Sequence, residues 1–427
     1  MSLLKSEAIK AVSSLWLATL VGAGLAFFTQ AILARLLLPE AYGVFSSSLS
    51  LVMLFVPLAG FGVAQFWLKT FGQEGWAARR WLKGSLNFIV YSTGLVFCGL
   101  ITWALLGPHD LLTSYVLSLL AFHVLAQVIL ELVSSRLQLE EKYQALAIWQ
   151  LFPHLFRFLL VAILGLFLSY DLDVVLGSLM YSLVALVMMP IGYYMLKPMF
   201  TNDFGLVGHD RNIKGGNDIQ KSWKAVFALS WPFGLAAFAH LIYYQSDIVL
   251  LKYLDSDTSA GIYNIAFLVI SAVYLLPGVI YQKYFLPKIH RWSIQEPARV
   301  KSVFEQGNIA MLLLGLLFML GIWIAADWGI TLLFGKSYTE AAYVLKALSF
   351  SVPFMFVAFS AGAVLVTQNH IKLKVKIMLL VALLNVVLNL ILIPKYGMIG
   401  AASATILSNA LLATLYFFTA KRLVIQK

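Results

Sequence analysis

Ionisable and amide side chains recur at helical spacing inside several long apolar segments. Gln150, His154 and Arg157 follow one another at intervals of four and three residues, and His240 and Asp247 are seven residues apart. Such spacing places side chains on one face of an α-helix. An ionisable group in the middle of a bilayer costs about 2.5–3.5 kcal/mol on insertion scales, so it is expected to face a cavity or a partner. The chemistry that these residues offer is substrate and ion binding inside a membrane.

Arg157 is the deepest of these charges, because it lies at the midpoint of an apolar segment over residues 145–169. No acidic residue lies within one turn of it in sequence, and its depth makes it difficult for the guanidinium to reach the membrane surface. A guanidinium is the side chain best matched to phosphate oxygens. We therefore expect Arg157 to face a cavity and bind an anionic substrate, with His154, Gln150 and Lys346 as further substrate-binding residues.

Three other ionisable residues are candidates for coupling transport to an ion, namely Asp247, His240 and Glu131. Alternative roles stay open for two of them. Asp247 is also placed to pair with Lys252 or Lys346, and Glu131 lies near a segment end where it can reach the surface or pair with a loop. The buried Asn and Gln side chains fit structural hydrogen bonds between helices.

At the outer ends of two segments, we expect structural ion pairs of Arg35 with Glu40 and of Lys252 with Asp257. These four residues occupy equivalent places in an internal repeat, which is described below.

The sequence contains no motif of a soluble enzyme or a metalloprotein. Cys98 is the only cysteine, so neither a disulfide framework nor a cysteine metal site is expected. Gly22-Ala23-Gly24 lacks the third glycine of a dinucleotide fingerprint and does not follow a strand. There is no HExxH motif, P-loop or paired-carboxylate constellation. We therefore expect no catalytic residue, no metal, no cofactor and no enzymatic activity.

The composition is that of a membrane protein. The chain is 61% hydrophobic and 11% charged, against roughly 25% charged residues in soluble domains. Apolar runs of about 20 residues recur along its 427 residues. These runs are continuous rather than alternating, which favours helices over a β-barrel. Twelve spans are predicted, near residues 12–34, 42–68, 84–106, 111–134, 145–169, 173–196, 225–251, 260–286, 306–329, 340–367, 376–394 and 398–420.

The basic residues are distributed unequally between the two sides of these spans. The N-terminus and every second connection after it, together with the C-terminus, hold 24 of the 30 Lys and Arg residues. Positive residues concentrate on the cytoplasmic side of membrane proteins, so both termini are expected in the cytoplasm. The same distribution accounts for the net charge of +11 without a nucleic-acid partner.

One stretch occurs twice and divides the chain into halves. Residues 30–52 and 247–270 align so that Gly43 meets Gly261 after a one-residue gap. Each copy ends one apolar segment, turns over a few polar residues and enters the next segment. Such self-similarity indicates two equivalent halves, as in secondary transporters.

The predicted fold is an all-α polytopic membrane protein of about twelve helices in two parallel-repeat six-helix lobes around a central cavity. The predicted domains are an N-terminal lobe over residues 1–196, a glycine-rich cytoplasmic linker over 197–224 and a C-terminal lobe over 225–427.

The repeated ARLLLPEAYGVF stretch resembles the opening of the bacterial polysaccharide-transporter (O-antigen flippase) family of the multidrug/oligosaccharidyl-lipid/polysaccharide exporter superfamily. The segments from Ser246 to Tyr263 and from Pro394 to Thr405, and the basic residue Arg157, are similar to that family as well. The resemblance implies alternating access in the inner membrane. It also implies a cargo of undecaprenyl-pyrophosphate-linked oligosaccharide, such as an O-antigen repeat unit. The implied partners are this cargo, membrane lipid and other polysaccharide-assembly membrane proteins, and we expect a monomer.

Three alternatives are open. A lipid II flippase of the same superfamily usually carries an Arg-Asp pair where this chain has Thr29-Gln30, and it usually has fourteen spans. A multidrug or small-cation antiporter favours acidic groups in its cavity, whereas the deepest charge here is Arg157. A membrane-bound glycan polymerase or ligase needs acidic or histidine clusters, usually on a large extramembrane loop, and the sequence predicts none.

Overall fold

The described part of the chain is mainly helical. The computed structural model describes residues 2–167, 173–201, 203–209, 220–366 and 370–425, and no β-strand occurs in these ranges. The predicted class, an all-α polytopic membrane protein, is confirmed.

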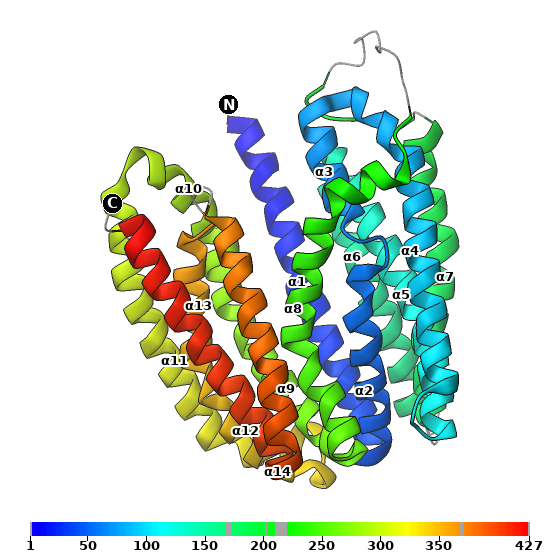
Figure 1. Cartoon of the computed structure of the whole chain (residues 1–427), viewed down its shortest axis with the longest axis vertical. Coiled ribbons are helices and arrows are strands. Elements are labelled where there is room, and N and C mark those ends of the chain that lie inside the picture. The colour runs from blue at the N-terminus through cyan, green and yellow to red at the C-terminus, as the bar shows by residue number, and fades with distance from the viewer. Residues whose placement is uncertain (1, 168–172, 202, 210–219, 367–369, 426–427) are drawn as a thin grey trace. The chain divides into compact units, whose positions relative to one another are not determined.

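The first half of the chain begins with seven α-helices (Figure 1). They are α1 (Ser2–Leu36), α2 (Pro39–Phe55), α3 (Val63–Glu74), α4 (Leu82–Leu106), α5 (Leu111–Leu139), α6 (Tyr143–Ala162) and α7 (Val174–Thr201). Two short 3₁₀-helices, η1 (Val56–Leu58) and η2 (Gly75–Trp81), and a π-helical segment, η3 (Ile163–Phe167), join or extend them.

Seven further α-helices follow. They are α8 (Trp223–Leu254), α9 (Asp257–Gly278), α10 (Leu286–Gln295), α11 (Pro297–Phe334), α12 (Glu340–Ser349), α13 (Ser351–Val364) and α14 (Ile371–Ala420). The shorter elements are the π-helical segments η4 (Val279–Phe285) and η6 (Lys421–Ile425) and the 3₁₀-helix η5 (Lys336–Tyr338).

Within the described residues, nine helical stretches are long and apolar enough to cross a membrane. There are ten if the bent pair Glu340–Ser349 and Ser351–Val364 forms one span. Two of the stretches, Pro39–Leu106 and Ile371–Leu423, are far longer than the roughly 20 residues that cross a bilayer. Each contains two of the predicted spans, and the second is kinked between them at Gly397, which has φ of 52°. Within the described residues, all twelve predicted spans therefore coincide with helical segments, and the ends of the spans 145–169 and 340–367 lie outside these residues.

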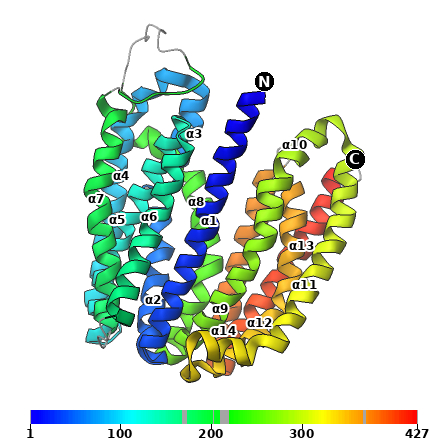
Figure 2. The ribbon, with the colours of Figure 1, turned by 180° about the vertical axis from the view of Figure 1, so that it is seen from behind.

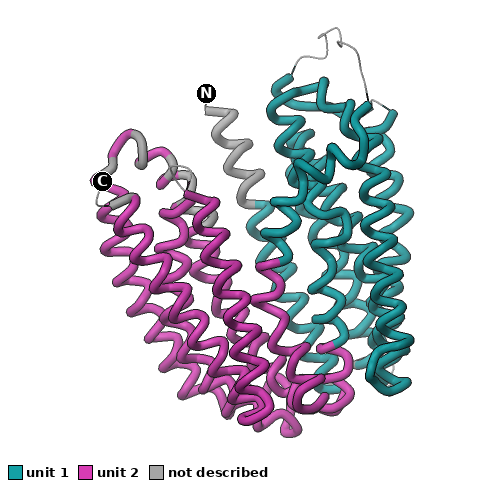
Figure 3. Tube along the Cα trace, in the orientation of Figure 1, with its two compact units in different colours: residues 1–36, 48–238 teal, residues 37–47, 239–427 magenta. Residues whose placement is uncertain are grey.

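The chain forms two compact units (Figure 3). Unit 1 consists of residues 1–36 and 48–238, and unit 2 of residues 37–47 and 239–427. The predicted boundaries place all of α8 in the second lobe and all of α2 in the first. By packing, the first half of α8 belongs to unit 1 and the start of α2 belongs to unit 2.

Unit 1 is built around two helix pairs. Helix α5 packs along α7, and α1 packs along α6; the views from opposite sides show both pairs side by side (Figures 1 and 2). Small residues allow the close approach, because a Cβ at Gly192 of α7 would lie 2.2 Å from a side-chain carbon of Ile129 on α5. The start of α8 joins this unit through Phe227, whose ring stacks on Phe61 at 5.9 Å.

Unit 2 is built from α9 and α11–α14. Helix α13 packs against both α11 and α14, and α12 packs against α9. Glycines lie at these contacts too: a Cβ at Gly315 of α11 would lie 2.6 Å from the Pro353 backbone of α13. Van der Waals contact between close backbones is a main source of helix association in a membrane, where no hydrophobic effect acts between helices.

Two prolines in equivalent segments of the two halves mark helix breaks. Pro57 lies in η1, after which Gly60, Phe61 and Gly62 all have positive φ. Pro277 lies at the end of α9, where the helix changes into the π-helical η4. A proline removes a backbone donor and crowds the preceding turn, so both breaks have a local cause.

The two glycines aligned by the internal repeat are in direct contact within unit 2. A Cβ at Gly43 of α2 would lie 1.7 Å from the carbonyl oxygen of Asp257, and one at Gly261 of α9 would lie 2.3 Å from that of Pro39. Asp257 and Pro39 each precede the other glycine by four residues. The contact is therefore reciprocal, as expected for equivalent positions of a repeat.

Part of the predicted linker is docked on unit 1. Phe204 is 2% exposed, and its ring lies against Phe71 and Trp76 at centroid distances of 5.6 and 5.0 Å. The backbone amide of Gly205 donates to Glu140 Oε1 at 3.3 Å. This part of the predicted linker is therefore packed against unit 1. The central stretch of the linker, residues 210–219, lies outside the described residues.

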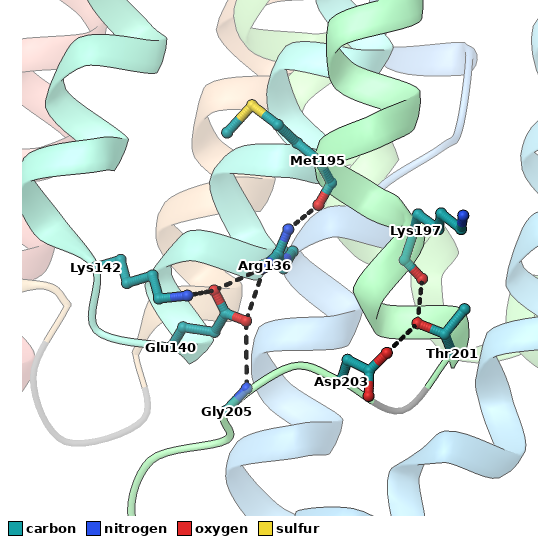
Figure 4. Close-up of polar contacts among 8 residues, drawn as sticks. All are labelled: Arg136, Glu140, Lys142, Met195, Lys197, Thr201, Asp203 and Gly205. Carbon is teal, nitrogen blue, oxygen red and sulfur yellow. Dashed lines mark hydrogen bonds and ion pairs between the residues drawn. The ribbon is translucent and has the colours of Figure 1, made fainter.

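Glu140 is the centre of this attachment (Figure 4). Its carboxylate also accepts from Arg136 Nη2 at 2.9 Å and lies 3.0 Å from Lys142 Nζ, and Arg136 donates to the Met195 carbonyl at the end of α7. A carboxylate with three donors around it is held in one orientation. The cluster thus joins α5, α7 and the docked part of the linker.

Candidate functional site

Unit 1 encloses a polar cavity of about 540 Å³ between α1, α3, α5 and α6. Its polar lining consists of amide, hydroxyl, carboxylate and imidazole groups, with four glutamines among them. These residues are Thr19, Gln65, Gln127, Glu131, Ser134, Ser135, Gln138, Gln150 and His154. Polar side chains are costly inside a membrane unless they bind a partner or a ligand. A cavity lined by so many of them is therefore the candidate functional site.

Three of the residues predicted from sequence lie together in this cavity. Gln150 and His154 come from α6 and Glu131 comes from α5. The His154 ring lies against α1, where a Cβ at Gly22 would come within 3.3 Å of its Cδ2 atom. Gly22 therefore leaves the space that the imidazole occupies.

Glu131 is exposed to the cavity. Within the described residues it forms no ion pair, so the expected pairing with a loop is not found. Its carboxylate gives the cavity a local negative charge beside the amides.

Arg157 lies behind the cavity rather than in its lining. It is 8% exposed, and its guanidinium carbon lies 4.0 Å from the centre of the Tyr181 ring on α7, a cation–π contact. Among the described residues no carboxylate lies within ion-pair distance of it, and its Nε atom is buried without a hydrogen-bond partner. Gln30 of α1 donates to the Tyr181 hydroxyl at 3.0 Å. The positive charge is therefore held on an aromatic face and is not neutralised by an acid there.

A second histidine extends this polar layer. His123 of α5 is 3% exposed, its Nε2 atom lies 3.0 Å from the side-chain nitrogen of Gln127, and its ring lies 5.9 Å from that of Tyr181. His123, Gln127 and Glu131 follow one another at intervals of four residues, which places them on one face of α5. Tyr181 was not predicted, because its apolar surroundings in the sequence give no polar spacing that would single it out.

Asp247 of unit 2 is buried and is surrounded by neutral donors. It is 3% exposed and accepts from the Tyr263 hydroxyl at 2.7 Å, from Asn389 Nδ2 at 2.5 Å and from the Thr405 hydroxyl. Asn385 joins the cluster through Ser246, at 3.2 Å, and through Asn389, at 3.1 Å. The sequence pairs Asn385 and Asn389 on one helix face but gives no indication that they meet Asp247.

Neither lysine considered as a partner of Asp247 pairs with it. Lys252 pairs with Asp257, as the alternative structural interpretation predicts, and Lys346 Nζ lies 2.6 Å from Asp327 Oδ2. Arg35 forms no ion pair with Glu40 within the described part of the chain. Lys346 therefore does not pair with Asp247, although both residues belong to unit 2. Arg157 belongs to unit 1.

His240 is also separated from Asp247. Its ring lies 4.6 Å from that of Tyr244, and both residues line a second cavity, of about 450 Å³, within unit 2. Among the described residues no group of three or more His, Cys, Asp or Glu side chains is placed to hold a metal ion.

Comparison with known proteins places the chain in a family. A family model described as polysaccharide biosynthesis protein matches residues 8–293. The chain belongs to the polysaccharide biosynthesis protein family. A second model, MatE, matches residues 290–391, and the resemblance drawn from the sequence motifs is thereby confirmed.

Two curated relatives of this polysaccharide biosynthesis protein have informative names. It is 26% identical to the probable low-salt glycan biosynthesis flippase Agl15 of Haloferax volcanii over 197 residues. This stretch covers 46% of this chain and 42% of the relative. It is 26% identical over 211 residues to the capsular polysaccharide biosynthesis protein CapF of Staphylococcus aureus, 48% and 52% of the two chains. The chain thus spans about half the length of these relatives.

Solved structures show the fold of this polysaccharide biosynthesis protein. The lipid II flippase MurJ in an inward closed conformation superposes with a TM-score of 0.71 at 14% identity, over 96% of this chain and 88% of that one. An inward-facing multidrug resistance MATE transporter gives 0.68 at 11% identity, over 97% and 98%. The chain therefore has the fold of these transporters, as a multi-pass membrane protein.

Proposed function

We propose that this protein is a flippase that moves a polyprenyl-pyrophosphate-linked oligosaccharide across the cytoplasmic membrane by alternating access. The observation that carries the proposal is the cavity of unit 1, whose polar lining residues are mainly amides and hydroxyls, in a chain of the polysaccharide biosynthesis protein family. Undecaprenyl pyrophosphate as the carrier, an O-antigen or similar repeat unit as the glycan, and an inner-membrane location with both termini in the cytoplasm are part of this proposal.

The cavity suits the sugar part of such a cargo. A glycan cannot cross the hydrocarbon layer unaided, because its hydroxyl groups would lose their hydration without replacement. Gln65, Gln127, Gln138 and Gln150 each offer both a donor and an acceptor, which matches the two roles of a sugar hydroxyl. The carboxylate of Glu131 would repel a pyrophosphate but accepts hydrogen bonds from hydroxyl groups. We therefore assign sugar binding to this cavity.

Arg157 is the proposed source of positive charge beside the cavity. It lies one helical turn from His154 on α6, and its guanidinium has no acidic partner among the described residues. Direct contact between Arg157 and a pyrophosphate requires the guanidinium to leave the Tyr181 ring. The cation–π contact, worth about 0.5–2 kcal/mol, is weak enough to be exchanged for a charge-assisted hydrogen bond.

We propose Asp247 as the residue that couples transport to an ion. A buried carboxylate that accepts from three neutral side chains and, among the described residues, forms no ion pair can take up a proton or a monovalent cation with little rearrangement. The membrane potential assists further: an anion moving outward gains about 2.3 kcal/mol per charge per 100 mV. His240 stays a second coupling candidate, and Glu131 a third.

The alternatives differ in cargo. The fold is shared with a lipid II flippase and with multidrug transporters, so it does not discriminate among them. The glutamine-rich lining favours a sugar over a small cation. A polymerase or ligase would need a catalytic constellation, and the polar groups of the cavity supply no nucleophile paired with a base.

The test is export of surface glycan by cells that carry Arg157→Ala or Arg157→Lys in place of the native protein, at matched protein level. We expect Arg157→Ala to reduce export at least tenfold, about the effect of a lost 1.4 kcal/mol contact, and Arg157→Lys to reduce it less. The exposed arginine Arg422 provides the control, and Arg422→Ala should export normally. Normal export by Arg157→Ala would make Arg157 structural.

A further inference from the structure

A second cavity lies within unit 2. Its charged lining residue is a lysine, whereas that of the unit 1 cavity is a glutamate. The unit 2 cavity measures about 450 Å³ and lies between α8, α13 and α14. Its polar groups are one lysine, one histidine and three tyrosines: Lys374, His240, Tyr243, Tyr244 and Tyr416. None of the described residues that line it is acidic, and its remaining lining is apolar, including Met355, Phe359 and Met378.

Lys374 brings a positive charge to this cavity without a counter-charge. In the described part of the chain it forms no ion pair, unlike Lys252 and Lys346, which lie in the same unit. Its ammonium nitrogen lies 5.8 Å from the centre of the Tyr416 ring, and its stem passes Gly362 of α13. A lysine that lines a cavity instead of pairing with an acid leaves its charge available to a ligand.

Tyr243 adds a hydrogen-bond donor that is not used. Its hydroxyl is buried and has no partner among the described residues, although a buried hydroxyl normally finds one. By contrast, the Tyr416 hydroxyl donates to the Lys374 carbonyl at 3.4 Å. An ammonium and an unpartnered phenol hydroxyl, in a cavity with no acid among its described lining residues, are hydrogen-bond donors that suit an anion.

We propose that this cavity binds a phosphate or pyrophosphate group, with Lys374 and Tyr243 as its donors. The apolar part of the lining suits a phosphate that carries a hydrocarbon chain. The inference rests on the proposed function only in the identity of the cargo, because the cavity would offer the pyrophosphate of the lipid-linked glycan a second binding site besides Arg157. Anion binding itself follows from the cavity and does not depend on glycan transport.

The experiment measures equilibrium binding to the purified full-length protein in detergent, with three probes. Farnesyl pyrophosphate represents a prenyl-linked pyrophosphate, inorganic pyrophosphate a free anion and dioleoylphosphatidylglycerol a phospholipid headgroup. The variants are Lys374→Gln, Lys374→Arg and Tyr243→Phe. The control is Lys372→Gln, which removes an exposed lysine two residues from Lys374.

We expect Lys374→Gln to weaken binding of farnesyl pyrophosphate about tenfold or more, the equivalent of a lost charge-assisted hydrogen bond. Tyr243→Phe should weaken it severalfold, Lys374→Arg should largely restore it, and Lys372→Gln should leave it unchanged. Tighter binding of farnesyl pyrophosphate than of inorganic pyrophosphate supports a lipid-linked source. The same lysine dependence with inorganic pyrophosphate or phosphatidylglycerol supports the site with that anion as its ligand.

Two results would overturn the proposal. One is unchanged binding of all three probes by both Lys374→Gln and Tyr243→Phe. The other is an equal loss in Lys372→Gln, which would indicate attraction by surface charge. A strain that lacks the protein yet exports glycan normally would refute the proposed function and leave these binding results standing.

Discussion

At the scale of residues, the two cavities differ in the charge that they offer. The cavity of unit 1 combines amides with the carboxylate of Glu131, whereas that of unit 2 combines tyrosines with the ammonium of Lys374. Arg157 lies behind the first cavity on Tyr181. On the proposals above, the cavity of unit 1 suits a neutral polar group and the cavity of unit 2 suits an anionic group.

The position of His154 offers a test of the unit 1 cavity. Gly22→Val should push the imidazole out of its place, since even a Cβ at residue 22 lies 3.3 Å from it, and export should fall about tenfold. Gly24→Val is the matched control, because a Cβ at residue 24 meets nothing within 4 Å. Glycan export per molecule of protein is the measurement. An equal effect of the two substitutions would show that His154 placement is irrelevant.

Asp247 offers a second test at this scale. Asp247→Asn removes the titratable charge and places an amide among donors that all point at a carboxylate. The unsatisfied donors should lower the free energy of unfolding by roughly 1–3 kcal/mol. We expect transport in proteoliposomes to lose its dependence on an ion gradient. Asp327→Asn removes an exposed acid of the same unit and should keep that dependence. A gradient response retained by Asp247→Asn would exclude Asp247 from coupling.

At the scale of elements, glycines decide which helices pack closely. The reciprocal contact of Gly43 with Asp257 and of Gly261 with Pro39 brings the starts of α2 and α9 together. No side chain fits there, because the added carbon would overlap a backbone oxygen. The packing explains why residues 37–47 belong to unit 2 although they follow α1 of unit 1.

Gly43→Ala and Gly261→Ala should therefore destabilise the protein. Forcing a methyl group into packed helices costs about 1–3 kcal/mol or more, which outweighs the gain of about 1 kcal/mol from replacing a helical glycine by alanine. The apparent melting temperature in detergent should fall by roughly 1–3 °C. Gly329→Ala, in α11, meets nothing within 4 Å and should be neutral or stabilising. A neutral Gly43→Ala would contradict the close contact.

At the scale of the whole molecule, the sequence predicts the fold better than the site. Runs of apolar residues, the two copies of one stretch and the basic connections depend on composition and spacing, so the helices and their repetition could be predicted. The stacking of Arg157 on Tyr181 and the pairing of Lys346 with Asp327 depend on which helices meet, and no local pattern encodes that. The burial of Phe204, in a glycine-rich connection, could not be predicted for the same reason.

The most direct test of the account is flipping in proteoliposomes that contain the purified protein and a fluorescent prenyl-pyrophosphate-linked oligosaccharide. The account predicts that label on the inner leaflet becomes accessible to an external quencher much faster than in protein-free liposomes. It also predicts that lipid II and a cationic drug are moved poorly. A rate equal to that of empty liposomes, or a preference for either competing cargo, would contradict the claim that this chain carries lipid-linked glycan.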